Sequence, residues 1–388
     1  MRTPYIFVLC SIALVGAQDL GVPLSWRKFS NSRPLSERIT IAQNAIDAVM
    51  PQLNSGTGEF NGIGYWQSGN VWSVLANQDR LAGSTTNQAA VVANLNKVFS
   101  LHANYDPFQW WATAAVYAHR AYGDANLLSH AVATWNHVTS FVVTPAQASA
   151  GKSPQKSFTL RGNCDGVTMA GGVFWTLSYV RSLGSSIGLT TDRLSRLSAY
   201  LAETTGDSKY TSAAIQSANW IKAHNLNANR IVLDTVNAND CSRSPADWLF
   251  TYNSGKFIEG LSVLADVTGD AQWTTLMINT LQPAVKSPPW QGSDGIITEG
   301  ASPNANNDGV GFKAIFIRAL HEAFERNADN NDLRILIHSY IDVQYNALLD
   351  LAANGSTYSS NWHGPSQAFT TWGQLAALDV HTSAINAN

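Results

Sequence analysis

The chain has few charged residues for its length, few cysteines and no surplus of basic charge. Only 13% of its 388 residues are Asp, Glu, Lys or Arg, and its formal net charge is -3. A chain without a basic surplus lacks the electrostatic footprint of nucleic-acid binding. No segment approaches the roughly 20 uninterrupted apolar residues that a membrane-spanning helix needs. We therefore expect a neutral partner, with neither nucleic acid nor membrane.

The first residues read as a targeting signal. The stretch "MRTPYIFVLCSIALVGAQ" combines one early arginine, a short apolar run and small residues at Gly16 and Ala17. This order is typical of a secretory signal peptide, so we expect residues 1–17 to be removed and residues 18–388 to be secreted as one domain. The C-terminal "AALDVHTSAINAN" lacks a lipid-anchor tail, so we expect a freely secreted, extracellular monomer.

Three cysteines are present, and one of them, Cys10, lies in the expected signal peptide. The remaining two, Cys164 and Cys241, form an even pair in a chain sent to an oxidising compartment. A disulfide between them is the prediction, and two buried free thiols are the alternative. Asn354 begins an "NGS" sequon and is a candidate for N-glycosylation in a eukaryotic cell.

Apolar residues recur three and four positions apart along most of the chain, which predicts an all-α fold. We expect helices at about 35–50, 66–80, 85–103, 107–121, 125–143, 168–184, 190–205, 208–224, 247–267, 270–286, 308–327, 331–352 and 366–382. A Gly-Asp turn recurs between helices at Gly123, Gly206 and Gly269. The glycine ends one helix and the aspartate caps the next, so we predict repeated helical hairpins closed into an (α/α)6 barrel. The long loops would gather at its mouth.

One stretch, "FTYNSGKFIEGLSVLADVTGD", resembles the signature of glycoside hydrolase family 76, the α-1,6-mannanase family. The stretches "AGGVFWT", "FKAIFIRAL" and "SQAFTTWGQLAALDV" are similar to that family too, in the same order along the chain. The resemblance implies a divergent, secreted fungal member. It further implies hydrolysis of α-1,6-mannosidic or related α-glycan linkages of cell-wall polysaccharide. The sequence has no phosphate loop or dinucleotide fingerprint, so we expect no cofactor.

Members of the family resemble one another in a twin-aspartate motif at the start of a helix, followed by two tryptophans. Here "DPFQWW" places Asp106 at the first position and Pro107 at the second. The resemblance implies that Asp106 is the nucleophile. As a bare Asp-Pro pair, the same residues are also a good helix opening, so capping is the structural alternative for Asp106.

Retaining glycosidases need a second carboxyl group, and proline cannot supply it. Our preferred candidate is Asp165, which lies beside Cys164 and before a glycine-rich stretch, where partial burial would raise the pKa of its carboxyl. Capping or a bond to a sugar hydroxyl is the alternative for Asp165. Other candidates are Asp247, Asp294, Glu299 and Asp308.

The chain contains thirteen Trp, twelve Tyr and fourteen Phe, more rings than a core needs. Rings with one polar edge are suited to the faces of sugars. We expect substrate contacts from Tyr105, Trp110, Trp111, Tyr252, Asn253 and Asp308; further ring candidates, which are equally consistent with core packing, are Tyr65, Trp66, Trp175 and Trp362. Capping of a helix is the alternative for Asn253.

The histidines show no ligand spacing, so we expect no metal. Two rival functions remain open at this stage. Replacement of the second aspartate by Pro107 suggests a glycan-binding protein that has lost its chemistry. A transglycosidase acting on wall glycan is the other.

Overall fold

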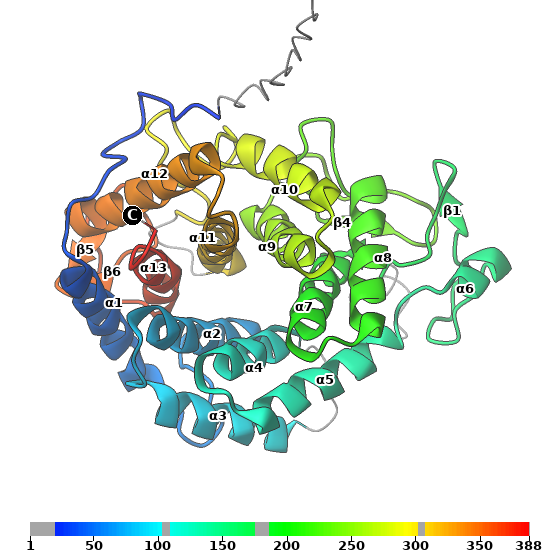
Figure 1. Cartoon of the computed structure of the whole chain (residues 1–388), viewed down its shortest axis with the longest axis horizontal. Coiled ribbons are helices and arrows are strands. Elements are labelled where there is room, and N and C mark those ends of the chain that lie inside the picture. The colour runs from blue at the N-terminus through cyan, green and yellow to red at the C-terminus, as the bar shows by residue number, and fades with distance from the viewer. Residues whose placement is uncertain (1–19, 103–108, 175–185, 302–306, 388) are drawn as a thin grey trace, which may run out of the picture.

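A computed structural model describes residues 20–102, 109–174, 186–301 and 307–387. The expected signal peptide, together with Tyr105, Asp106, Pro107 and Trp175, lies outside these ranges. The described helices form two concentric rings (Figure 1), which confirms the predicted (α/α)6 barrel. The inner ring contains α2 (Tyr65–Ala82), α4 (Gln109–Tyr122), α7 (Leu189–Thr205), α9 (Thr251–Thr268), α11 (Asp308–Arg326) and α13 (Thr371–Ser383). The outer ring contains α1 (Leu35–Val49), α3 (Gln88–Leu101), α5 (Ala125–Thr139), α8 (Ser208–His224), α10 (Ala271–Ala284) and α12 (Asn331–Ala347).

Short elements occupy the loops that connect the helices. Three antiparallel pairs of strands are formed by β1 (Asn163–Cys164) with β2 (Val167–Thr168), β3 (Ser186–Gly188) with β4 (Thr235–Asn237), and β5 (Ala353–Asn354) with β6 (Thr357–Tyr358). A short helix, α6 (Pro145–Ala150), a 3-10 turn (Met50–Gln52) and a π turn (Leu348–Ala352) complete the elements. Asn354, the glycosylation candidate, is exposed in β5.

Two helix predictions need correction. The stretch from Thr168 to Phe174 is not helical, because Gly171 has a φ of 99° and the chain there forms a strand and turns. The prediction also missed α6, which begins with Pro145 and has a capping box between Thr144 and Gln147. Both errors lie in the segment that leaves the ring near β1 (Figure 1).

The recurring Gly-Asp turns work as predicted. Each glycine has a φ between 63° and 71°. Asp124 caps α5, Asp207 caps α8 and Asp270 caps α10 by accepting hydrogen bonds from backbone N–H groups. These turns join the end of an inner helix to the start of the next outer helix, so they close one end of the barrel tightly.

The two rings differ in how they are buried. Outer helices bury one stripe, as in α10, where the buried residues are Trp273, Leu276, Met277, Thr280, Leu281 and Ala284. Inner helices are buried on nearly every side, because outer helices cover them and their remaining faces fill the centre. Gly255 of α9 allows close packing there, since a Cβ at this position would lie 2.9 Å from the Cα of Phe316 in α11.

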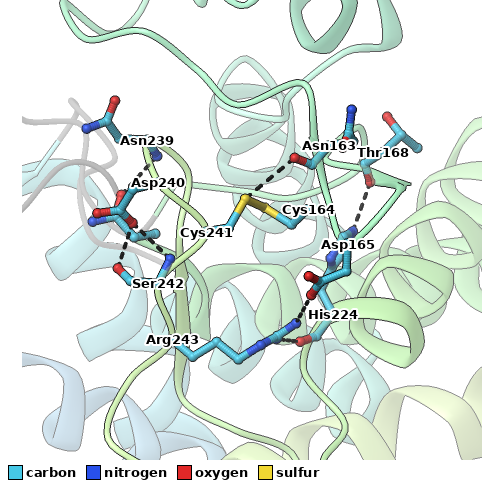
Figure 2. Close-up of a disulfide and its surroundings, with 11 residues drawn as sticks. Asn163, Cys164, Asp165, Thr168, His224, Asn239, Asp240, Cys241, Ser242 and Arg243 are labelled. Carbon is cyan, nitrogen blue, oxygen red and sulfur yellow. Dashed lines mark hydrogen bonds and ion pairs between the residues drawn. A yellow bond between two sulfur atoms is a disulfide. The ribbon is translucent and has the colours of Figure 1, made fainter.

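The structure joins Cys164 and Cys241 in a disulfide, as predicted. The bond ties the β1–β2 hairpin to the loop after β4 (Figure 2). Both segments lie at the edge of the molecule, beyond α8 in Figure 1. The disulfide therefore fastens two long loops to each other rather than to the inner ring.

Replacing both cysteines, as Cys164→Ser with Cys241→Ser, should destabilise the protein. The cysteines are 77 residues apart, and a closed loop of this length is worth about 4 kcal/mol in the chain-entropy model. Urea denaturation should give a lower midpoint for the double variant, and reductant should lower the wild-type midpoint similarly. A reduced wild type with an unchanged midpoint would contradict this stabilising role.

Candidate active site

The inner helices all begin at one end of the barrel, which we call the mouth. Aromatic residues near the N-termini of four inner helices meet there: Trp66 of α2, Trp110 of α4, Tyr252 of α9 and Phe312 of α11. Helix N-termini carry partial positive charge, so this end favours carboxylates and developing negative charge. The mouth is therefore the end of the barrel that suits an active site.

These four rings and Phe250 form what we call the mouth cluster. The Trp66 centroid lies 5.2 Å from Trp110 and 5.8 Å from Phe312. The rings of Tyr252 and Phe312 stack at 4.0 Å, and Phe250 lies 5.3 Å from Phe312. Trp110, Tyr252 and Phe312 are at most 9% exposed, whereas Trp66 and Phe250 are only partly buried. The cluster offers partly open rings above a rigid aromatic floor.

Trp110 and Trp111 point in different directions, as adjacent residues on a helix must. Trp110 joins the mouth cluster, but the Trp111 ring lies 5.1 Å from Tyr65 and 3.2 Å from the position of a Cβ on Gly69. Trp111 and Tyr65 therefore belong to the packing between α2 and α4. Trp362, another sequence candidate, is fully buried.

Asp308, the first residue of α11, lies beside the mouth cluster. Its Oδ1 accepts hydrogen bonds from Trp66 Nε1 at 3.1 Å and from Gln67 Nε2 at 2.5 Å. Within the described ranges, no donor is bonded to Oδ2, and the residue is exposed. One oxygen is thus fixed by two donors while the carboxylate remains open to a ligand.

Tyr252 and Asn253 both donate hydrogen bonds to the buried carboxylate of Asp234, a residue that the sequence analysis did not single out. Asp234 Oδ1 accepts from Asn253 Nδ2 at 2.9 Å and from Tyr252 OH at 3.4 Å. Asn253 is fully buried and does not cap α9, so the capping alternative is wrong. The Asp234 bonds fix Tyr252 at the floor of the cluster.

The cap of α9 comes instead from Glu299, whose carboxylate accepts from the backbone N–H of Thr251 at 2.9 Å and from its hydroxyl. Burial raises the pKa of Glu299 to about 7. Nearby, burial lowers the pKa of Lys313 to about 7, and its ammonium donates to the carbonyl of Ser360 at 2.6 Å. Two groups that titrate near neutral pH therefore lie beside the mouth cluster, next to Phe312 and Tyr252.

Asp165 does not fit the expectation of a partly buried acid. It lies in the β1–β2 hairpin with φ 53°, and its side chain is 84% exposed. Figure 2 shows it pointing to Arg243, whose guanidinium lies 3.3 Å away and also donates to the carbonyl of His224. Periodicity says nothing about where a long loop runs, and this one leaves the ring. The expected burial of Asp165 is therefore wrong.

Charged side chains, rather than an apolar core, fill the barrel beneath the mouth cluster. Glu259 of α9 pairs with Arg196 of α7 at 2.8 Å, and both side chains are fully buried. The same carboxylate accepts from Tyr117 OH and Tyr200 OH, each at 2.9 Å. The Arg196 guanidinium lies 5.4 Å from the ring centroid of Trp110, so this network supports the floor of the mouth cluster.

Comparison with known proteins gives one matching family model and several solved structures with a similar fold. The family model described as "Glycosyl hydrolase family 76" matches residues 40–388. The GH76A α-1,6-mannanase from Salegentibacter sp. HEL1_6 is 15% identical with a TM-score of 0.74, over 90% of this chain and 100% of that one. An inactive variant of it, with two consecutive aspartates replaced by alanine, is in complex with α-1,6-mannotetrose; it is 15% identical with a TM-score of 0.73, over 90% and 99% of the two chains.

A further similar structure is Dfg5 from Chaetomium thermophilum in complex with glucosamine, which is 17% identical with a TM-score of 0.71 over 92% of each chain. At these identities the solved structures show a shared fold. Among curated proteins, none is significantly similar in sequence. In the parts of the chain that the structure describes, no helix is long and apolar enough to cross a membrane, and no three potential ligands are grouped around a metal position.

The central network yields a stability prediction. Glu259→Leu leaves Arg196 buried without its carboxylate, which should lower the free energy of unfolding by about 3–5 kcal/mol. Adding Arg196→Met removes the stranded charge and should recover part of that loss, as guanidinium denaturation can measure. A double variant that loses as much as both single variants together would contradict the coupling.

Glu299 yields a pH prediction. Its pKa rises from 4.5 to about 7 on folding, so between these values the native state holds a proton that the unfolded chain has lost. Its contribution to stability therefore falls as the pH rises from 4.5 to 7. Glu299→Gln should remove about 1–2 kcal/mol of that decline, a reduced figure because the side chain is partly exposed.

Urea titrations at several pH values would measure this effect, with Glu37→Gln on the exposed face of α1 as the control. An unchanged pH profile in Glu299→Gln would count against a Glu299 that keeps its proton in the folded protein.

Proposed function

This chain belongs to glycosyl hydrolase family 76, and from that membership we propose that it hydrolyses α-1,6-mannosidic linkages in cell-wall mannan. Two of the similar solved structures are forms of an α-1,6-mannanase, one of them bound to α-1,6-mannotetrose. The observation that carries the proposal is the mouth cluster, where partly open rings lie beside the Asp308 carboxylate and at the start of the helix that follows Asp106. Rings of this kind suit the faces of sugars.

The proposed mechanism uses two carboxyl groups. Asp106 attacks the anomeric carbon and forms a glycosyl-enzyme, while the second group protonates the leaving glycosidic oxygen. The same group then takes a proton from water, which hydrolyses the intermediate and restores both carboxyls. The inactive mannanase variant lacks two consecutive aspartates. By the motif resemblance, Pro107 takes the second of these positions in this sequence.

We place the second carboxyl at Asp308. Its oxygen is bonded to Trp66, whose ring contacts Trp110, four residues after Asp106. Asp165 is a poorer choice, because it is exposed on the outer hairpin and paired with Arg243.

We also propose that the protein is exported. The N-terminal stretch has the order of a signal peptide. The Cys164–Cys241 bond is of the kind that persists in oxidising compartments, and wall glycan lies outside the cell.

A glycan-binding protein without activity is the second candidate, favoured by Pro107 alone. It would keep the aromatic cluster and the carboxylate contacts but lack proton transfer. Restoring the missing group in Pro107→Asp should then create hydrolysis where the wild type shows none.

Product release from α-1,6-mannan, followed by mass spectrometry, tests the proposal. Wild type should release free oligosaccharides, and Asp106→Asn and Asp308→Asn should each lose at least about a thousand-fold in kcat. Asp165→Asn is the matched control and should stay within about twofold of wild type.

A wild type that is inactive beside an active Pro107→Asp would show that the chain is a binding protein. If Asp165→Asn loses as much activity as the other two variants, the acid is Asp165, as the sequence analysis expected. Lengthened products in place of free oligosaccharides would indicate glycan transfer.

A further inference from the structure

An exposed tryptophan extends the mouth cluster outward. Trp248 is 49% exposed and lies three residues before the first residue of α9. Its ring centroid is 6.2 Å from Phe250, which lies 5.3 Å from Phe312. Phe312 in turn lies 5.8 Å from Trp66, and Trp66 lies 5.2 Å from Trp110. Ring contacts thus run without a break from open solvent to the helix that follows Asp106.

The exposed aromatic side chains lie just before the starts of inner helices. Among the large hydrophobic side chains exposed in the described ranges, the aromatic ones are Trp248 and Phe369. Phe369 lies just before α13, whereas Trp248 lies just before α9, and these helices flank α11 on either side. Both rings therefore stand at the mouth, to either side of the helix that begins with Asp308.

The segment that carries Trp248 is held in place on both sides. The Trp248 N–H donates to the carbonyl of Pro245 at 2.9 Å, and Trp290 Nε1 donates to the carbonyl of Leu249 at 2.6 Å. Glu299 fixes Thr251 immediately afterwards. A ring on a fixed backbone loses little conformational entropy when a ligand stacks on it, so its exposure suits binding.

We propose that Trp248 is an outer sugar-binding position, on which a pyranose unit distant from the cleaved bond stacks. This inference rests on the proposed function and adds a residue that binds the polymer away from the cleaved bond. The occupant follows from continuity with the mouth cluster: a polymer whose reacting unit lies near Trp66 and Asp308 would continue along the same row of rings. A short oligosaccharide would end before reaching Trp248.

Affinity measurements on a catalytically inactive variant test this position separately from catalysis. We would measure the affinity of the Asp106→Asn protein for α-1,6-mannan and for α-1,6-mannotriose by calorimetry, with and without Trp248→Ala. Loss of one stacked ring should weaken polymer binding roughly tenfold and leave mannotriose binding within about twofold. Trp248→Phe keeps a ring and should restore most of the polymer affinity.

Ile335→Ala is the matched control, because Ile335 is also 49% exposed but lies on outer helix α12. It should change neither affinity. Equal polymer affinity with and without the Trp248 ring would overturn the proposal, as would equal losses for polymer and mannotriose. A wild type that dimerises through Trp248, with unaltered mannan binding in Trp248→Ala, would assign the ring to a protein interface and also overturn it.

The two proposals fail in different ways. If wild type binds mannan but releases no product, the hydrolase activity is wrong, whereas a polymer-specific loss in Trp248→Ala still supports the outer position. If no form of the protein binds mannan, both are overturned.

Discussion

The buried carboxylate of Glu259 is the contact on which the arrangement of the inner ring depends. It lies on α9 and accepts hydrogen bonds from Arg196 and Tyr200 on α7 and from Tyr117 on α4. A charge this deep is tolerated only when its partners are correctly placed, so the pairing constrains three helices at once. Trp110 lies against the Arg196 guanidinium, which places the floor of the candidate site directly on this network.

The two ends of the barrel differ in how the helices are connected. At one end, Gly-Asp turns such as Gly123-Asp124 reverse the chain in few residues and satisfy helix N-termini with their own carboxylates. At the other end, long loops bring polar groups from distant parts of the sequence to the first turns of the inner helices. Glu299 and Asp234 reach the mouth in this way, and Asp308 joins them as the first residue of α11. The buried network around Glu259 lies beneath the mouth, and the long loops surround the mouth itself.

Sequence reasoning succeeded where the determining interactions are local. Apolar spacing predicts the helices, and a glycine followed by aspartate predicts how they are joined, because both depend on neighbouring residues. The fixed contacts of the site are not local: Asp308 and Trp66 are 242 residues apart, and Glu299 and Thr251 are 48 apart. No periodicity encodes such pairs. The same limit explains Asp165, whose loop runs outward along a path that its composition does not determine.

In the proposed mechanism, a glycan lies across the mouth cluster between Asp106 and Asp308. A crystal structure of the Asp106→Asn protein with α-1,6-mannotetrose tests it most directly. A sugar ring should lie against Trp66, with residue 106 and the Asp308 carboxylate about 5–5.5 Å apart on either side of one glycosidic bond. A glycan bound elsewhere, or side chains separated by well over about 9.5 Å, would contradict it.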